Sequence, residues 1–262
     1  MRRSPTQPRA YVPELPPPGG RCTVPTDQVQ HLVQVLRLTP GDRFLAFDGR
    51  GQRRLCRLEH VERGRAATAL VEETLVAPPG LELPHALELR VAPPRAAREE
   101  SLVRSAVELG ATRLSPLVAR RGVRNPTRRP QALQRRWARW AIEACKQCGR
   151  DLLPEVTDPW SPGSAQASLE DAVVLHPSTP LLLPSLLEER LPGPVIVIVG
   201  PEGGLAEEEI DLLRSRGCRL AGLGPVTLRV ETAALAALAT AATWLRTRGS
   251  AAGPAQKNSS TS

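Results

Sequence analysis

The residues best suited to bind a small molecule form a glycine-rich turn, Gly-Pro-Glu-Gly-Gly, at positions 200–204. Five Val and Ile residues precede the turn, and such an unbroken apolar run is typical of a strand buried on both faces of a parallel sheet. Three glutamates at 207–209 follow it and suit the positive first turn of a helix. Ligands of parallel α/β sheets bind beyond the carboxyl ends of the strands, where glycines let the backbone come close. The turn matches neither Gly-x-Gly-x-x-Gly nor a Walker loop, so a tight turn without a ligand is the alternative.

A second motif follows the first at a short distance. A strand-like piece at 219–223 leads into Gly-Pro-Val-Thr-Leu-Arg-Val-Glu-Thr-Ala at 224–233 and then into an alanine-rich helix. Together the motifs resemble the SPOUT methyltransferases, and specifically the RsmE-type bacterial family that methylates N3 of a uridine in 16S ribosomal RNA. That family carries Gly-Pro-Glu-Gly-Gly, Leu-Gly and Leu-Arg-x-Glu-Thr-Ala, which match residues 200–204, 223–224 and 228–233.

The resemblance implies a trefoil-knotted α/β domain, S-adenosyl-L-methionine as cofactor, and a homodimer that completes each site. Carried over position by position, it implies cofactor binding by Val199, Gly200, Pro201, Gly204, Leu223, Gly224 and Leu228, largely through backbone groups. Val226 and Thr227 differ from the family's usual residues in this loop.

Arg229 and Glu231 are the predicted catalytic residues. Loss of the uracil N3 proton places negative charge on the flanking carbonyls, and a fixed guanidinium at Arg229 would stabilise it as an oxyanion hole does. Glu231 would steer Arg229 or a substrate group. The alternatives are an intersubunit ion pair for Arg229 and a cap of the last helix for Glu231.

The charge balance indicates a polyanionic partner. The 262 residues include 35 basic and 27 acidic side chains, a net charge of +8. Nearly all the basic residues are arginines, which bind phosphate with two hydrogen bonds and stack on bases, so the composition suits RNA. The alternative is the compositional bias of a GC-rich genome.

The five cysteines, with no secretory segment ahead of them, indicate reduced thiols in a cytoplasmic protein. Cys145 and Cys148 have the spacing of half a zinc site or of a redox pair. No second pair of ligands accompanies them, so we expect structural thiols and no metal. No apolar stretch reaches the roughly 20 residues that a membrane span requires.

Two differently patterned regions predict two domains. Residues 1–75 contain short strands around an Asp-Gly turn at 48–51 and one helix at 26–36, which reads as a β-barrel, and the resemblance implies a PUA-like RNA-binding domain. We expect much of the segment from residue 1 to about residue 20 to be mobile or extended. Residues 76–85 form a proline-rich linker, and strands alternate with helices over 86–248, as in an α/β domain with a parallel sheet. The tail, 249–262, should be disordered.

Clustered arginines are candidates for RNA binding. A helix predicted over 128–147 carries a stripe of Leu133, Trp137 and Trp140, more typical of a core than of a base-stacking platform, and turns arginines outward. The resemblance further implies that Gln147 and Arg150 line the active cleft. The predicted RNA contacts are Arg9, Arg37, Arg120, Arg121, Arg135, Arg136, Arg139, Gln147 and Arg150, and the alternative for the outward arginines is a solvated surface.

The predicted function is S-adenosylmethionine-dependent methylation of uridine N3 in 16S ribosomal RNA of the small subunit. Two alternatives stay open. A different SPOUT enzyme would methylate a ribose 2′-hydroxyl, and a non-catalytic RNA-binding dimer would keep the basic clusters without binding the cofactor.

Overall fold

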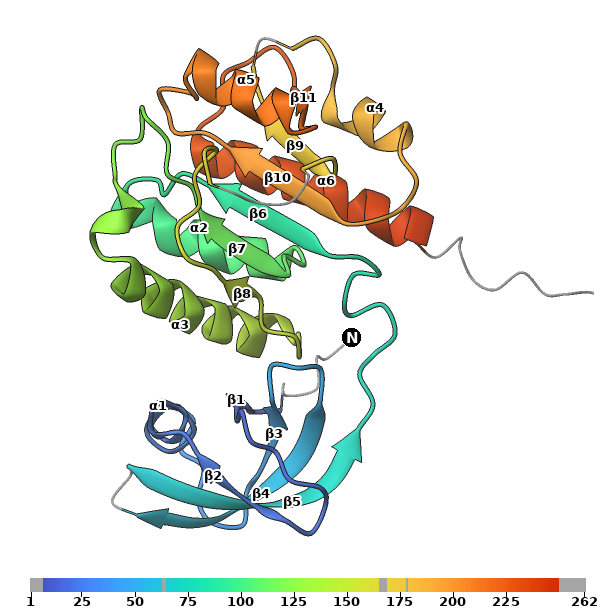
Figure 1. Cartoon of the computed structure of the whole chain (residues 1–262). Coiled ribbons are helices and arrows are strands. Elements are labelled where there is room, and N and C mark those ends of the chain that lie inside the picture. Colours follow the sequence, from blue (N-terminus) through green and yellow to red (C-terminus); the bar gives the residue numbers. More distant parts are fainter. Residues whose placement is uncertain (1–6, 63–64, 165–168, 178, 250–262) are drawn as a thin grey trace, which may run out of the picture. The chain divides into compact units, whose positions relative to one another are not determined.

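A computed structural model describes residues 7–62, 65–164, 169–177 and 179–249 (Figure 1). The chain divides into two compact units. Unit 1 comprises residues 1–82 and 141–153, and unit 2 comprises residues 83–140 and 154–262. Residues 141–153 therefore belong with the amino-terminal sheet, although they continue a helix that begins in unit 2. The tail predicted to be disordered lies outside the described residues, apart from Gly249.

Unit 1 is built on a five-stranded curled sheet with the order β1-β3-β4-β5-β2. Its elements are β1 (Arg9–Tyr11), β2 (Arg21–Val24), α1 (Thr26–Val29), the π-helical segment η1 (Gln30–Val35), β3 (Arg43–Phe47), β4 (Arg53–Glu62) and β5 (Ala66–Leu75). The β1–β3 pair is parallel and the other pairs are antiparallel. Phe44, Leu58 and Leu32 are fully buried at the centre of its apolar core.

One sequence-based prediction for unit 1 is confirmed in part and another needs correction. The extended backbone predicted for the proline-rich start is present in β1, which pairs with β3 and buries Ala10. The helix expected at 26–36 changes type at Gln30: the Leu36 N–H donates to the His31 carbonyl at 3.0 Å, five residues back. An apolar pattern does not distinguish a π turn from an α turn.

Unit 2 contains a six-stranded, wholly parallel sheet with the order β11-β9-β10-β6-β7-β8, which confirms the predicted α/β class. Its elements are β6 (Leu87–Val91), α2 (Ala96–Glu108), β7 (Arg113–Pro116), the 3-10 turn η2 (Pro126–Arg128), α3 (Pro130–Cys148, which ends in unit 1), β8 (Glu155–Val156), β9 (Ala172–Leu175), α4 (Leu183–Glu188), β10 (Val195–Val199), α5 (Glu207–Ser215), β11 (Arg219–Ala221) and α6 (Val230–Gly249). The trefoil knot stays a prediction.

Helices cover both faces of this sheet around its central strand β10. Ile210 and Leu213 of α5 pack with Val174 and Ile198 on one face, whereas α6 contacts β6 and β10 and also packs against α2 (Figure 1). This two-sided cover explains why β10 is a continuous Val and Ile run. The strand leads directly into the glycine-rich turn.

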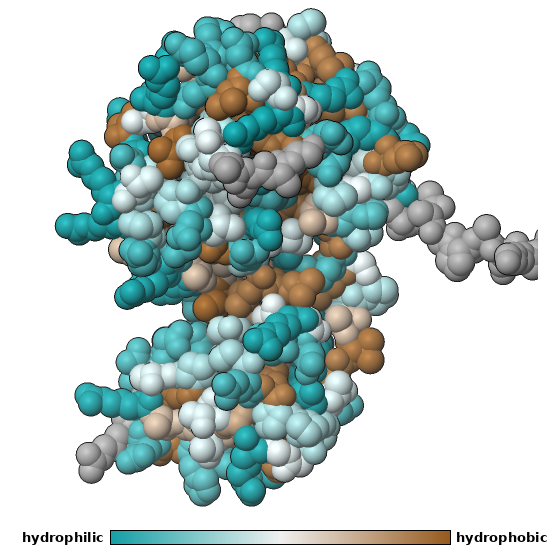
Figure 2. Space-filling model, viewed as in Figure 1, coloured by the Kyte–Doolittle hydropathy of each residue, from teal (hydrophilic) through white to brown (hydrophobic). Residues whose placement is uncertain are grey.

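The tryptophan stripe of α3 is core, as predicted: Leu133, Trp137 and Trp140 are buried. On the face of the protein shown in Figure 2, hydrophilic side chains predominate. Within the described residues, no helix is long and apolar enough to cross a membrane.

Candidate active site

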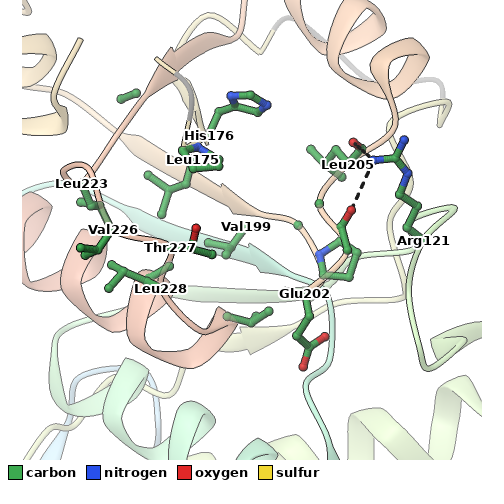
Figure 3. Close-up of a pocket in the computed structure, with 18 of the residues that line it drawn as sticks. Arg121, Leu175, His176, Val199, Glu202, Leu205, Leu223, Val226, Thr227 and Leu228 are labelled. Atoms are coloured by element: carbon green, nitrogen blue, oxygen red, sulfur yellow. Dashed lines mark hydrogen bonds between the residues drawn. The ribbon is translucent and has the colours of Figure 1, made fainter. Parts of the chain in front are cut away.

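A cavity of about 330 Å³ lies in unit 2 where three neighbouring parallel strands end (Figure 3). Most of its lining residues lie at or just after the ends of three strands: β9 (Leu175 to Pro177), β10 (Val199 to Leu205) and β11 (Ala221, Leu223, Gly224, Val226, Thr227, Leu228 and Val230). Because β9 lies between β11 and β10, the segments that follow the three strands meet at one edge. The volume is within the range of small-molecule sites, roughly 300–1,000 Å³.

The cavity has an apolar side and charged groups around it. Figure 3 shows Leu223, Val226 and Leu228 on the side opposite Arg121. The remaining polar and charged lining side chains include His176, Glu202, Glu207 and Thr227. Such a lining suits a ligand with one flat apolar part and other parts that carry charge.

Glycines shape the turn for two different physical reasons. Gly204 has φ +70°, a conformation that a residue with a Cβ rarely adopts, and its N–H donates to the Pro201 carbonyl at 2.8 Å. At Gly200 the reason is space, since a Cβ would come within 3.0 Å of Leu205 Cγ. Gly224, in the opposing loop, has φ +124°.

The cavity brings together all the residues predicted to bind the cofactor. Its lining contains Val199, Gly200, Pro201, Gly204, Leu223, Gly224 and Leu228. Val226 and Thr227, which differ from the family pattern, line it as well. Contact of these residues with a cofactor stays a prediction.

The sequence-based predictions missed the residues after β9 and did not include Arg121 among the residues that line the cavity. Leu175, His176 and Pro177 line the cavity only because β9 pairs with β10, and no local pattern indicates that pairing. Arg121, predicted as an RNA contact, also lines the cavity and donates from Nη1 to the Gly203 and Leu205 carbonyls at 3.3 and 3.4 Å.

The predicted catalytic pair lies just outside the cavity lining. Arg229 is exposed and has no ion pair within the described chain, and its carbonyl accepts from Ala233 N–H at 2.8 Å. Glu231 forms an ion pair with Arg98 of α2 at 2.9 Å, and its Oε2 is buried without a hydrogen-bond partner among the described residues. The partner of Glu231 is therefore Arg98, which the sequence did not indicate.

The arginines near α3 differ in their surroundings. Arg120, Arg135 and Arg139 are exposed. The prediction that Arg136 points outward is wrong: it is half-buried, donates from Nη2 to both oxygens of Glu99 at 2.9 Å, and lies over the Trp140 ring. The buried carboxylate of Glu99, on α2, binds Arg136, on α3, and nothing in the sequence indicates that these two residues are in contact.

The predicted RNA contacts of unit 1 do not line the cavity. Arg9 is buried and binds Asp151 at 2.9 Å, and Arg150 is buried and binds Glu82 at 2.8 Å. Gln147 and Arg37 are exposed, and Arg37 has φ +60°, unusual for a residue other than glycine. RNA binding by these four residues stays a prediction.

The Cys145 thiol is a structural group. It is buried, donates to the Leu152 carbonyl at 3.6 Å, and burial raises its pKa to about 12. Among the residues that the structure describes, no group of three or more His, Cys, Asp or Glu side chains is arranged to hold a metal ion.

Comparison with known families defines the class of protein. Residues 81–242 match the model of the RNA methyltransferase domain, and residues 24–70 match that of the RNA methyltransferase PUA domain. The chain is thus that of an RNA methyltransferase with a PUA domain.

Individual relatives narrow the class. The chain is 34% identical to ribosomal RNA small subunit methyltransferase E of Synechocystis over 83% of this chain and 71% of that protein. It is 30% identical to the Mycobacterium tuberculosis protein of the same name, over 87% and 88%. The chain belongs to the ribosomal RNA small subunit methyltransferase E family, as its motifs predicted.

Two solved structures are similar to this chain over most of its length. The Neisseria gonorrhoeae member of this family, bound to S-adenosyl methionine, has a TM-score of 0.79 at 28% identity, over 90% of this chain and 97% of that one. A candidate methyltransferase from Legionella pneumophila with bound cofactor SAM has a TM-score of 0.78 at 28% identity, over 92% and 97%.

Proposed function

We propose that the protein transfers a methyl group from S-adenosylmethionine to N3 of a uridine in 16S ribosomal RNA of the small subunit. One observation carries the proposal: both family motifs meet in a single cavity at the carboxyl ends of β9, β10 and β11. Relatives with the same overall fold are described with this cofactor bound.

The residues present fit such a cofactor. The sulfonium group supplies an electrophilic methyl group when the cofactor is bound, so the reaction needs no metal. Leu223 and Leu228 provide apolar surface for the adenosine, and the glycine turn brings backbone groups to the ligand. Glu202 and Glu207 carry the negative charge that suits a cationic ligand.

Arg229 is the proposed catalytic residue. Its guanidinium is exposed and not neutralised by a carboxylate within the described chain, so it is available to a uracil carbonyl on which charge develops. Glu231, held by Arg98, is the second proposed catalytic-site residue, and we propose that it fixes the start of α6, which directly follows Arg229.

The assembly is also part of the proposal. We propose that α6, which is apolar around most of its circumference, contributes to a homodimer in the cytoplasm. In this proposal the domain at 1–75 binds RNA, and a linker at 76–85 joins it to the catalytic domain at 86–248. Light scattering at micromolar concentration tests the dimer, and a monomeric mass would contradict it.

Methyl transfer from labelled S-adenosylmethionine to unmethylated small-subunit particles tests the reaction. After nucleoside digestion, mass analysis should find the label in N3-methyluridine. Label in a 2′-O-methylated nucleoside would instead indicate the ribose-directed SPOUT activity. Calorimetric failure to bind the cofactor, with RNA binding retained, would indicate a non-catalytic RNA-binding protein.

A further inference from the structure

A short basic loop lies against the glycine-rich turn of the cavity. This arginine loop, residues 119–124, follows β7 and is closed by a hydrogen bond from Gly122 N–H to the Ala119 carbonyl at 3.0 Å. Arg121 donates to the Gly203 and Leu205 carbonyls of the turn. A Cβ at Gly203 would lie only 3.3 Å from Arg121 Cβ, so the two segments are in close contact.

One buried carboxylate joins the arginine loop to the turn. Glu209 is 8% exposed, and its two oxygens accept hydrogen bonds from different segments. Oε2 accepts from Ala206 N–H at 2.8 Å, where the turn enters α5, and Oε1 accepts from Arg120 N–H at 3.0 Å. The same carboxylate therefore contacts both the end of the turn and the backbone of the arginine loop.

The other side of the arginine loop is open to a partner. Its Arg120 side chain is 66% exposed, and Val123 at its tip is 70% exposed. Arg124, at its far end, is fixed to the buried carboxylate of Glu99 at 2.6 Å. The loop thus presents positive charge outward while its position is set from within the unit.

We propose that Glu209 is a positioning residue that couples cofactor binding to RNA binding through the arginine loop. The inference rests on the proposed function. A ligand that favours one position of the turn also favours one position of the arginine loop, so the liganded protein presents the loop to RNA in that position. Linkage requires the reverse effect to be equal, so RNA raises cofactor affinity by the same factor.

The test compares the affinity of the protein for RNA in the absence and in the presence of S-adenosylhomocysteine, which is what the cofactor becomes after methyl transfer. Full-length fluorescently labelled protein is titrated with unmethylated small-subunit particles, alone and with saturating S-adenosylhomocysteine. The wild type should bind more tightly with the product by at least about five-fold, the lower end of typical couplings. Glu209→Gln, which replaces one acceptor oxygen by a donor, should reduce that ratio to near one.

Two further variants make the result decisive. Glu208→Gln removes the neighbouring charge, whose ion pair with Arg120 is exposed on both sides, and should keep the wild-type ratio. Arg121→Ala removes the hydrogen bonds from the arginine loop to the Gly203 and Leu205 carbonyls, and it should also reduce the ratio of the two RNA affinities. This variant tests the coupling if Glu209→Gln does not fold. An unchanged ratio in both Glu209→Gln and Arg121→Ala, or a wild-type ratio of one in an enzyme that methylates the particles, overturns the coupling alone. Absence of cofactor binding and methyl transfer in the wild type would instead overturn the proposed function beneath it.

Discussion

Replacing Glu99 by glutamine should destabilise unit 2 strongly, although the side chain keeps its shape. Glu99 is fully buried and accepts hydrogen bonds from Arg124 Nη1 at 2.6 Å, from Arg136 Nη2 at 2.9 Å, and from Trp137 Nε1 at 2.7 Å. The amide of glutamine removes the charge that compensates two cations. It also turns an NH2 group toward groups that can only donate.

The magnitude follows from burial. Breaking a fully buried ion pair by removing one partner costs about 3–5 kcal/mol. The Arg124 and Arg136 side chains are 36% and 33% exposed, so water replaces part of the missing interaction. We therefore expect a loss of about 2–3 kcal/mol, which lowers the melting temperature by about 4–12 °C for a domain of this size.

Tryptophan fluorescence during urea or thermal unfolding measures this loss selectively. All four tryptophans, at positions 137, 140, 160 and 244, belong to unit 2. Glu100→Gln is the matched control on the same helix, since its pair with Arg104 is half-exposed and an i, i+4 pair of this kind contributes about 0.3–0.5 kcal/mol. If Glu99→Gln unfolds within about 0.5 kcal/mol of the control, the buried carboxylate does not hold the cluster together.

Three other variants address the site. Gly204→Val forces a β-branched residue into φ +70° and should lower S-adenosylmethionine affinity by at least about ten-fold in calorimetry, whereas Gly163→Val, in open space without positive φ, should not. Reversal of exposed Arg135 and Arg139 to Glu should reduce the salt dependence of particle binding by up to about 0.9 in log–log slope for each phosphate that is no longer bound; an unchanged slope would make them a solvated surface. Arg229→Ala should reduce turnover by a factor on the order of 10² with cofactor affinity retained, and higher pH should recover part of the rate by ionising the uracil; turnover within a few-fold of wild type would exclude the role.

The sequence predicted those parts of the fold that depend on local pattern. The Val and Ile run of β10, the turn after it and the start of α5 were recognisable because strand burial, glycine and helix-dipole preferences each act over a few residues. The π-helical segment was not, since a change from i−4 to i−5 hydrogen bonds leaves the apolar pattern nearly the same.

The sequence predicted only those parts of the candidate site that carry the two motifs, at 199–204 and 223–228. His176 reaches the cavity because β9 pairs with both β10 and β11, and sheet order is a property of the whole fold. The partners of the arginines were equally hidden. Arg9 meets Asp151 across 142 positions of the sequence, a pairing that neither residue's neighbours indicate.

The arginine-rich segment shows why these hidden partners matter. Residues 120–129 contain five arginines and no acidic residue, so the segment repels itself and has no local reason to adopt one conformation. Carboxylates from other elements supply the order: Glu99 of α2 holds Arg124, and Glu209 of α5 holds the Arg120 backbone. Both carboxylates are buried, and the exposed Arg120 side chain forms an ion pair with the exposed Glu208. Contacts with residues distant in the sequence therefore hold the arginine loop in a defined position beside the cavity, and a local sequence pattern could not have predicted that position.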